Sequence, residues 1–168
     1  MELNSNNFKE AFAYAHKVSQ LSTAKKRKVG ALILQKDDDG NLIYICSGHN
    51  HRIGFDNCED IDGETLPDVI HAEENAIMRM LTSSNIQEHI NKSKPLIMVC
   101  TYAPCINCAK LMAQVGIKEL YYMQKHETKF DMVPNSPKQF LERLGIEIYS
   151  IKEFMKNDLL EKLITGEF

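Results

Sequence analysis

Two short motifs hold residue types that can bind a metal ion and move protons. The first, VIHAEENAI, places His71 and Glu73 at the start of a segment whose apolar residues recur at helical spacing. The second, APCINCAK, places Cys105 and Cys108 just after Pro104, a residue that suits the first turn of a helix. Residues three apart share one helix face, so both sulfurs should point the same way. If the two helix starts face each other, His71 and the two sulfurs can bind one ion.

This set of ligands predicts a catalytic zinc ion. One nitrogen and two sulfur ligands suit zinc, and three protein ligands leave a fourth tetrahedral position for water. Such a water loses a proton near pH ~7, and Glu73 beside it can accept that proton. The pairing of H-x-E with P-C-x-x-C is typical of zinc deaminases that act on nucleobases. We therefore predict that activated water attacks the ring carbon bearing an amine, while Glu73 carries protons to the ring nitrogen and to the departing ammonia.

The elements that must position the two motifs alternate along the chain. Apolar periodicity and capping signals predict helices over residues 6–21, 73–81, 104–115, 136–144 and 152 to about 164, and strands over residues 29–36, 42–48, 96–102, 118–123 and 146–151. Turn-forming residues at 37–41 predict a hairpin between the first two strands. Strands that alternate with helices after a hairpin predict an α/β fold in which helices cover both faces of a mixed sheet. The polar stretch 49–68 is long enough to indicate a functional loop.

Composition narrows the classes of protein to be considered. A chain of 168 residues with 43% hydrophobic residues and no repeat predicts a single domain over residues 1–168. The net charge of −3 argues against broad electrostatic binding to nucleic acid. No apolar leader and no run of about 18 apolar residues is present, so we expect a soluble cytoplasmic protein without membrane contact. The odd set of five cysteines favours metal or core roles over disulfides.

Four stretches, KVGALI, GFDNCED, HAEENAI and APCINCAKLMAQVGIKELYY, resemble the deoxycytidylate (dCMP) deaminases, especially the phage type, over about residues 11–151. The resemblance implies a cytidine deaminase-like α/β/α sandwich around a five-stranded mixed sheet. It implies a zinc-dependent hydrolase that converts dCMP to dUMP and ammonia in pyrimidine nucleotide biosynthesis, supplying dUMP for thymidylate synthesis. A homohexamer, allosteric activation by dCTP and inhibition by dTTP with Mg²⁺ are implied as well, and a phage-encoded protein would work in the host cytoplasm.

The resemblance also assigns roles by position in this chain. The implied substrate contacts are Asn50 with the sugar, the backbone of Ala72 with the pyrimidine edge, and the tyrosines Tyr102 and Tyr122 beside the nucleotide. The implied effector contacts are the basic residues Arg27 and Lys28 before the first strand, and Asp56 and Asn57 in the polar loop. Ala72 lies within the first metal motif and Tyr102 directly precedes the second, whereas the other residues lie farther along the chain.

One departure from the family pattern leaves alternatives open. The family usually has a glycine-rich GYNG-type turn followed by a proline, whereas this chain has GHNHRIG, so effector control is not settled by the sequence. His49, His51 and Cys58 can be read as solvent-facing or core residues, or as ligands of a second metal. GHN followed by arginine also resembles deaminases of free cytosine. The remaining rivals are a transfer RNA adenosine deaminase and a non-catalytic zinc-stabilised module that binds nucleotides; Glu73 argues against the latter.

Overall fold

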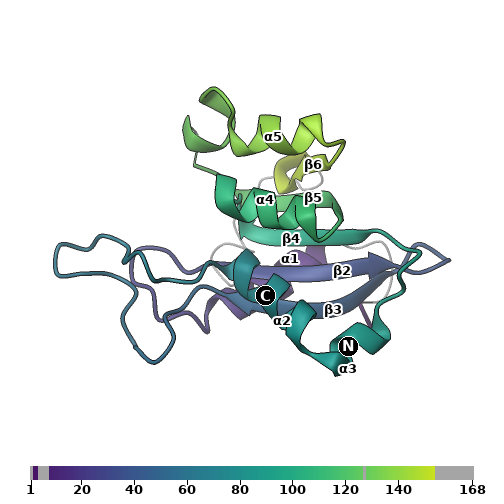
Figure 1. The fold of residues 1–168 in the computed structure, drawn as a ribbon, viewed down its shortest axis with the longest axis horizontal. Helices are drawn as coiled ribbons and strands as arrows, with labels where there is room; N and C mark the ends of the chain where they lie inside the picture. The colour runs from purple at the N-terminus through teal and green to yellow at the C-terminus, as the bar shows by residue number, and fades with distance from the viewer. Residues whose placement is uncertain (1, 4–7, 127, 154–168) are drawn as a thin grey trace.

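The helices and strands of the computed structural model alternate in the predicted order (Figure 1). The structure describes residues 2–3, 8–126 and 128–153. Its elements are β1 (Glu2–Leu3), α1 (Phe8–Ser19), β2 (Gly30–Lys36), β3 (Leu42–His49), α2 (Ala72–Thr82), α3 (Ser84–His89), β4 (Leu96–Tyr102), α4 (Ile106–Gln114), β5 (Ile117–Gln124), the π-helical turn η1 (Thr128–Met132), α5 (Pro137–Arg143), β6 (Glu147–Ser150) and the 3₁₀ turn η2 (Ile151–Glu153).

The strands form one mixed sheet in the order β1-β3-β2-β4-β5-β6. The predicted hairpin is present, because β2 and β3 pair antiparallel from Gly30 opposite His49 to Lys36 opposite Leu42. Strand β4 is antiparallel to β2, and β4, β5 and β6 are parallel to one another. Strands β2 to β6 make up the expected five-stranded mixed sheet, and the two-residue β1 extends its β3 edge.

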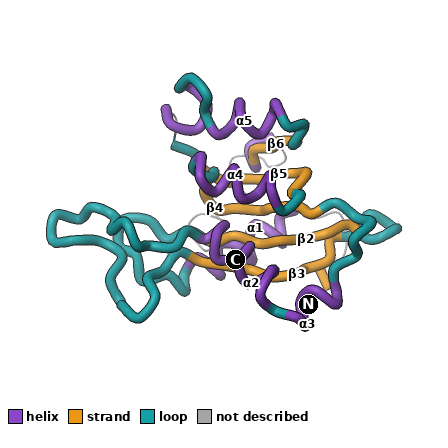
Figure 2. The backbone as a smooth tube through the Cα atoms, viewed as in Figure 1, coloured by secondary structure: helices purple, strands orange, loops and turns teal. Residues whose placement is uncertain are grey.

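Helices cover both faces of this sheet, which confirms the predicted layering (Figure 2). The alternation of side chains along β2 shows how the two faces are built: Ala31 and Ile33 belong to a core cluster with residues of α2, α4 and α5. Leu32 and Leu34 belong to a second cluster, on the face that α1 covers. The sheet is therefore buried on both sides, and α2 and α4, which carry the two motifs, lie on the same side.

Several boundaries differ from the prediction for local reasons. The helix expected from residue 104 begins at Ile106, since Cys105 is its N-cap and Pro104 lies outside it. The chain leaves helical geometry at Ser83, whose hydroxyl oxygen accepts a hydrogen bond from the Ile86 amide and so starts the unpredicted helix α3. The turn η1 was also not predicted. The helix predicted over 152–164 lies, beyond residue 153, outside the described residues.

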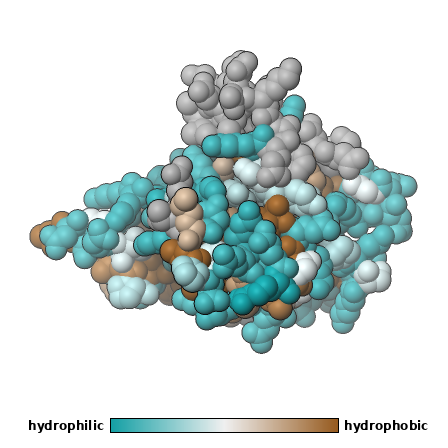
Figure 3. All heavy atoms as spheres, turned by 90° about the horizontal axis from the view of Figure 1, so that it is seen from above, coloured by the Kyte–Doolittle hydropathy of each residue, from teal (hydrophilic) through white to brown (hydrophobic). Residues whose placement is uncertain are grey.

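The connection between β3 and α2, residues 50–71, projects from the body of the molecule (Figure 1). Three isolated bridges brace it: His51 opposite Ile70, Arg52 opposite Phe55, and Glu59 opposite Thr65. Its outer part carries exposed apolar side chains, among them the fully exposed Ile61. In Figure 3, apolar atoms gather at the projecting tip, whereas hydrophilic atoms predominate on the rest of the visible surface. Within the described residues, no helix combines the length and apolar composition needed to span a membrane.

Candidate active site

The topology of the sheet brings the two motifs to one edge. Strands β3 and β4 are both antiparallel to β2, so they run in the same direction and end at the same edge. The loop after β3 leads into α2, and β4 leads into α4. His71 is the N-cap of α2 and Cys105 the N-cap of α4, each with an extended backbone. Neither side chain makes a capping hydrogen bond, so both are free to point toward a shared site.

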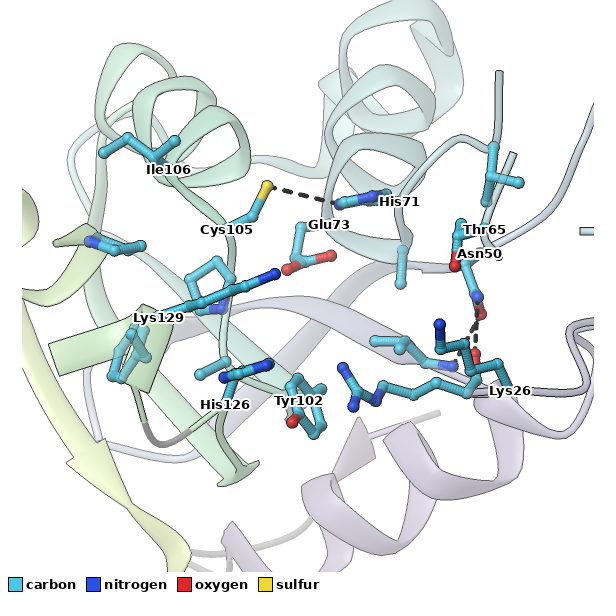
Figure 4. Close-up of a pocket in the computed structure, with 18 of the residues that line it drawn as sticks. Lys26, Asn50, Thr65, His71, Glu73, Tyr102, Cys105, Ile106, His126 and Lys129 are labelled. Carbon is cyan, nitrogen blue, oxygen red and sulfur yellow. Dashed lines mark hydrogen bonds between the residues drawn. The ribbon is translucent and has the colours of Figure 1, made fainter. Parts of the chain in front are cut away.

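His71, Cys105 and Cys108 meet in a single cluster. Figure 4 shows the Cys105 sulfur pointing toward the His71 ring. The His71 Nδ1 atom lies 3.6 Å from the Cys105 Sγ and 3.4 Å from the Cys108 Sγ. All three ligand atoms lie within 4.8 Å of one another. One imidazole nitrogen and two sulfurs at this separation fit a tetrahedral zinc ion, with one coordination position left for another ligand. In the described part of the chain, this is the group of histidine, cysteine and acidic side chains that comes close enough to hold a metal.

The three side chains share protons that a metal ion would displace. The hydrogen bond with Cys108, and then that with His71, lower the pKa of Cys105 to about 3. The hydrogen bond with Cys105 raises the pKa of His71 to about 9, against the opposing effect of burial. The neighbouring Cys105 sulfur also raises the pKa of Cys108. Metal binding at this site is therefore expected to release protons, because thiolate and neutral imidazole are the forms that bind.

Glu73 lies beside this cluster in the first turn of α2. Its side chain is 4% exposed, yet it lines a pocket, and Figure 4 shows its carboxylate next to Cys105 and His71. Burial raises the pKa of Glu73 to about 7, although the nearby His71 partly opposes that shift. A carboxyl group that titrates near neutral pH can both accept and return a proton. Its position at the helix start explains how His71 and Glu73, two residues apart, serve one site.

His71, Glu73 and Cys105 line a pocket with a volume of about 680 Å³. The predicted substrate contacts Asn50, Ala72 and Tyr102 line it, as does Arg27. The polar loop after β3, which was expected to be functional, also forms part of the pocket wall. The residues of this loop that line the pocket are Asn50, Cys58, Glu59, Glu64, Thr65 and Val69. Lys26, His126 and Lys129 line the pocket as well; Lys26 belongs to the basic run 25–28, whereas no sequence motif marks His126 or Lys129.

Tyr122 does not line the pocket, as its predicted contact with the nucleotide would require. It is buried, it is absent from the lining of the pocket, and its ring packs edge-on against Phe130 with the centroids 5.1 Å apart. Alternation along β5 directs Tyr122 into the core cluster beneath α4 and α5. Phe130, in the turn η1, lines the pocket instead.

Asn50 is held by the backbone that precedes β2. Its Oδ1 accepts a hydrogen bond from the Val29 amide at 2.8 Å, and its Nδ2 donates to the Arg27 carbonyl at 2.9 Å. The side chain thus fixes the segment from Arg27 to Val29 against the end of β3. An amide retains one further N–H and one further lone pair, so Asn50 can still bind a ligand in the pocket.

The other predicted effector residues lie outside this pocket. Lys28 and Asp56 are exposed and do not line the pocket. Asn57 accepts a hydrogen bond from Arg52 and donates one to the Glu59 carbonyl. It lines a smaller depression of about 420 Å³ with residues of the segments 25–26 and 59–63. The structure therefore does not bring the four predicted effector residues together.

The second metal site considered for His49, His51 and Cys58 is not assembled among the described residues. The two imidazole rings lie 5.5 Å apart, and the Asn75 amide donates to the His49 carbonyl at 2.9 Å. Cys58 is fully buried in a separate apolar cluster with Ala24 and Val69. The three residues are accounted for by these packing and hydrogen-bonding roles.

A glycine lets α2 approach the sheet closely enough to place His71 and Glu73. A Cβ atom at Gly48 would lie 2.4 Å from the Ala76 amide nitrogen and 2.5 Å from the Ala72 carbonyl oxygen. Both are backbone atoms of α2, so a larger residue must displace the helix. We expect Gly48→Ala to lower the free energy of unfolding by about 1–3 kcal/mol and to reduce zinc content. Urea denaturation and metal analysis measure the two effects.

Gly30→Ala is the matched control for this prediction. A Cβ atom at Gly30 would lie 2.1 Å from the Ala15 carbonyl oxygen, in the helix on the other face of the sheet. It should therefore cost similar stability but retain zinc. Equal zinc content in the two variants would show that the contact between Gly48 and α2 does not position the metal ligands.

Comparisons with known proteins agree with this geometry. The model of the cytidine and deoxycytidylate deaminase zinc-binding region matches residues 5–124. ComE operon protein 2 of Bacillus subtilis is 31% identical over 121 residues, and the deoxycytidylate deaminase of Enterobacteria phage T4 is 33% identical over 92 residues. The matches cover 69% and 54% of this chain, but 58% and 42% of those two relatives.

A solved structure is also similar over most of its length. The dCMP deaminase of the cyanophage S-TIM5, in complex with dCMP and dUMP, superimposes with a TM-score of 0.67 at 32% identity. The match covers 87% of this chain and 98% of that one. The fold, the His–Cys–Cys cluster and the matching family model lead to one conclusion. This chain belongs to the family defined by the cytidine and deoxycytidylate deaminase zinc-binding region.

Proposed function

We propose that this protein is a zinc-dependent hydrolase that converts dCMP to dUMP and ammonia, with residues 1–168 acting as a single deaminase domain. The observation that carries the proposal is the convergence of His71, Cys105 and Cys108 within 4.8 Å, beside the buried carboxyl group of Glu73. Similarity to a cyanophage dCMP deaminase solved with dCMP and dUMP supports this choice of substrate. The product dUMP would then supply thymidylate synthesis.

His71, Cys105 and Cys108 would hold the zinc ion. A zinc ion bound there supplies a water whose pKa is low enough for attack near neutral pH. Glu73 accepts the proton that water loses and transfers it to N3 of the pyrimidine as the new C4–O bond forms. Glu73 then takes the second proton of that water from the new hydroxyl group at C4 and delivers it to the exocyclic N4. The C4–O bond becomes a carbonyl as the C4–N4 bond breaks, and ammonia leaves. The burial of Glu73 excludes bulk water from this transfer and keeps its pKa near neutrality.

The pocket offers further groups for the nucleotide. We propose that Asn50 binds the sugar, that the Ala72 backbone meets the pyrimidine edge, and that Tyr102 lies beside the base; all three line the pocket. The basic residues of the same pocket are Lys26, Arg27, His126 and Lys129. Free cytosine has no phosphate that would need these cations, so they favour a nucleotide over the alternative substrate.

The resemblance to the family is also the basis for proposals about assembly and regulation. A homohexamer, control by dCTP and by dTTP with Mg²⁺, and a phage origin are carried over from the resemblance of the motifs. Arg27 lines the pocket with Glu73, which supports a role at the substrate for this residue in place of the effector role. Lys28, Asp56 and Asn57 are the residues left for an effector.

An ammonia-release assay on dCMP, CMP, deoxycytidine and cytosine, each with and without dCTP, tests the proposal. We expect dCMP to be preferred over cytosine by more than about tenfold in kcat/KM, because charge-assisted contacts to a phosphate are strong. Equal turnover of cytosine would instead support a free-base deaminase. Release of no ammonia from any substrate by zinc-loaded protein would support the non-catalytic nucleotide-binding module.

A further inference from the structure

Two basic side chains that line the pocket, Arg27 and Lys129, form no ion pair with a described residue. Of the pocket's other basic residues, Lys26 is paired with Glu64, with the Nζ atom 3.0 Å from the carboxylate. His126 takes part in a contact of its own. Among the described residues, neither Arg27 nor Lys129 has a carboxylate within 4.0 Å. Two cations in one pocket repel each other unless an anion lies between them.

The Arg27 side chain is held in position before any ligand binds. Its guanidinium lies 3.9 Å from the centre of the Tyr102 ring, in a cation–π contact. The Arg27 carbonyl accepts the hydrogen bond from Asn50. The two preceding amides, of Lys25 and Lys26, donate to the Glu59 carboxylate at 3.0 Å. Contacts on both sides of Arg27 therefore anchor its segment, and little side-chain freedom remains to be lost on binding.

Lys129 enters the same pocket from a separate segment, the π-helical turn η1. The next residue, Phe130, is buried against Tyr122 and anchors the turn to the core. The Lys125–Asp131 ion pair closes the turn on itself. Figure 4 shows Lys129 reaching toward Glu73 from the side of the pocket on which His126 also lies. A π-helical turn often occurs at functional sites, and here it directs a lysine into the pocket while the adjacent phenylalanine packs inward.

We propose that Arg27 and Lys129 bind the 5′-phosphate of the nucleotide from two separate segments, and that Lys129 determines the preference for nucleotides over nucleosides. This inference rests on the proposed function, since it concerns the same pocket. A phosphate monoester carries a charge of about −1.5 to −2 at neutral pH, which matches the two unpaired cations. Arginine supplies a planar pair of donors to phosphate oxygens, and lysine supplies a compact charge on a long, adaptable stem.

The test is the binding of dUMP and of deoxyuridine, measured by calorimetry on zinc-loaded protein. These two ligands differ only in the phosphate, and neither requires turnover. We expect the wild-type protein to bind dUMP at least about tenfold more tightly than deoxyuridine. Lys129→Met should weaken dUMP binding by about ten- to one-hundredfold and bring it close to that of deoxyuridine. Lys129→Arg should restore most of the loss, because it restores the charge.

Lys118→Met is the matched control, because Lys118 is exposed at the opposite end of β5 and does not line the pocket. It should bind dUMP as the wild-type protein does. The inference is overturned if the wild-type protein binds both ligands equally, if Lys129→Met keeps the preference for dUMP, or if it weakens both ligands alike. A failure of the proposed function gives a different result: dUMP binds tightly, yet dCMP yields no ammonia.

Discussion

Glu73→Gln is expected to retain a full complement of zinc and to lose about 10²- to 10⁴-fold in kcat on dCMP. The carboxylate is the group beside the His–Cys–Cys cluster that can accept a proton from water and deliver it to the pyrimidine. Glutamine has nearly the same shape and can still form hydrogen bonds, but it cannot carry a proton. Ammonia release and metal analysis on the same preparation separate loss of the proton carrier from loss of the ion.

The structure supplies a control and a test of folding for this variant. Glu74 is the adjacent glutamate, only partly buried and outside the pocket lining, so Glu74→Gln should remain near the wild-type rate. Because burial raises the pKa of Glu73 to about 7, the folded protein loses stability as the pH rises from the ordinary pKa of a glutamate to about 7, and the full loss is present above that pH. Replacing Glu73 with a neutral amide removes that loss, so Tm at pH 8 should not fall. A Glu73→Gln variant that kept near wild-type turnover would contradict the proposed proton transfer.

Cys105→Ala should lose the metal ion itself, and with it all measurable deamination. The sulfur lies 3.6 Å from the His71 nitrogen, and its removal leaves one nitrogen and one sulfur, too few protein ligands for a tight zinc site. We expect zinc content after gel filtration to fall from about one equivalent per chain to below about a tenth. Elemental analysis measures this directly, without dependence on the choice of substrate.

Cys58→Ala is the matched control for the loss of metal. Cys58 is also a free cysteine and is buried, but it packs against Ala24 and Val69, away from the cluster. It should retain zinc in full. If instead Cys105→Ala kept its zinc while Cys58→Ala lost it, the metal would have to reside at the alternative site formed with His49 and His51.

Local sequence patterns were sufficient for most of the helices and strands, though not for β1, α3 or η1, and for the residues of the His–Cys–Cys cluster. The strand Leu96–Tyr102 was predicted to the residue, and the β2–β3 hairpin was recognised from its turn. These features depend on periodicity, turn chemistry and capping, which act over a few neighbouring residues. The HxE and PCxxC motifs likewise require only that two helix starts meet, which the shared direction of β3 and β4 provides.

Tertiary structure alone decided which side chains share the pocket. Tyr102 and Tyr122 look alike in sequence, each near the end of a strand, yet one lines the pocket and the other packs against Phe130. Lys129 has no motif around it and enters the pocket through a π-helical turn that periodicity did not predict. Whether a side chain lines the pocket depends on the register of its strand, on how closely the helices approach the sheet, and on which distant segments fold against it. The contacts that place Lys129 in the pocket and Tyr122 in the core join distant segments and form only in the folded chain, and no local pattern around either residue marks them.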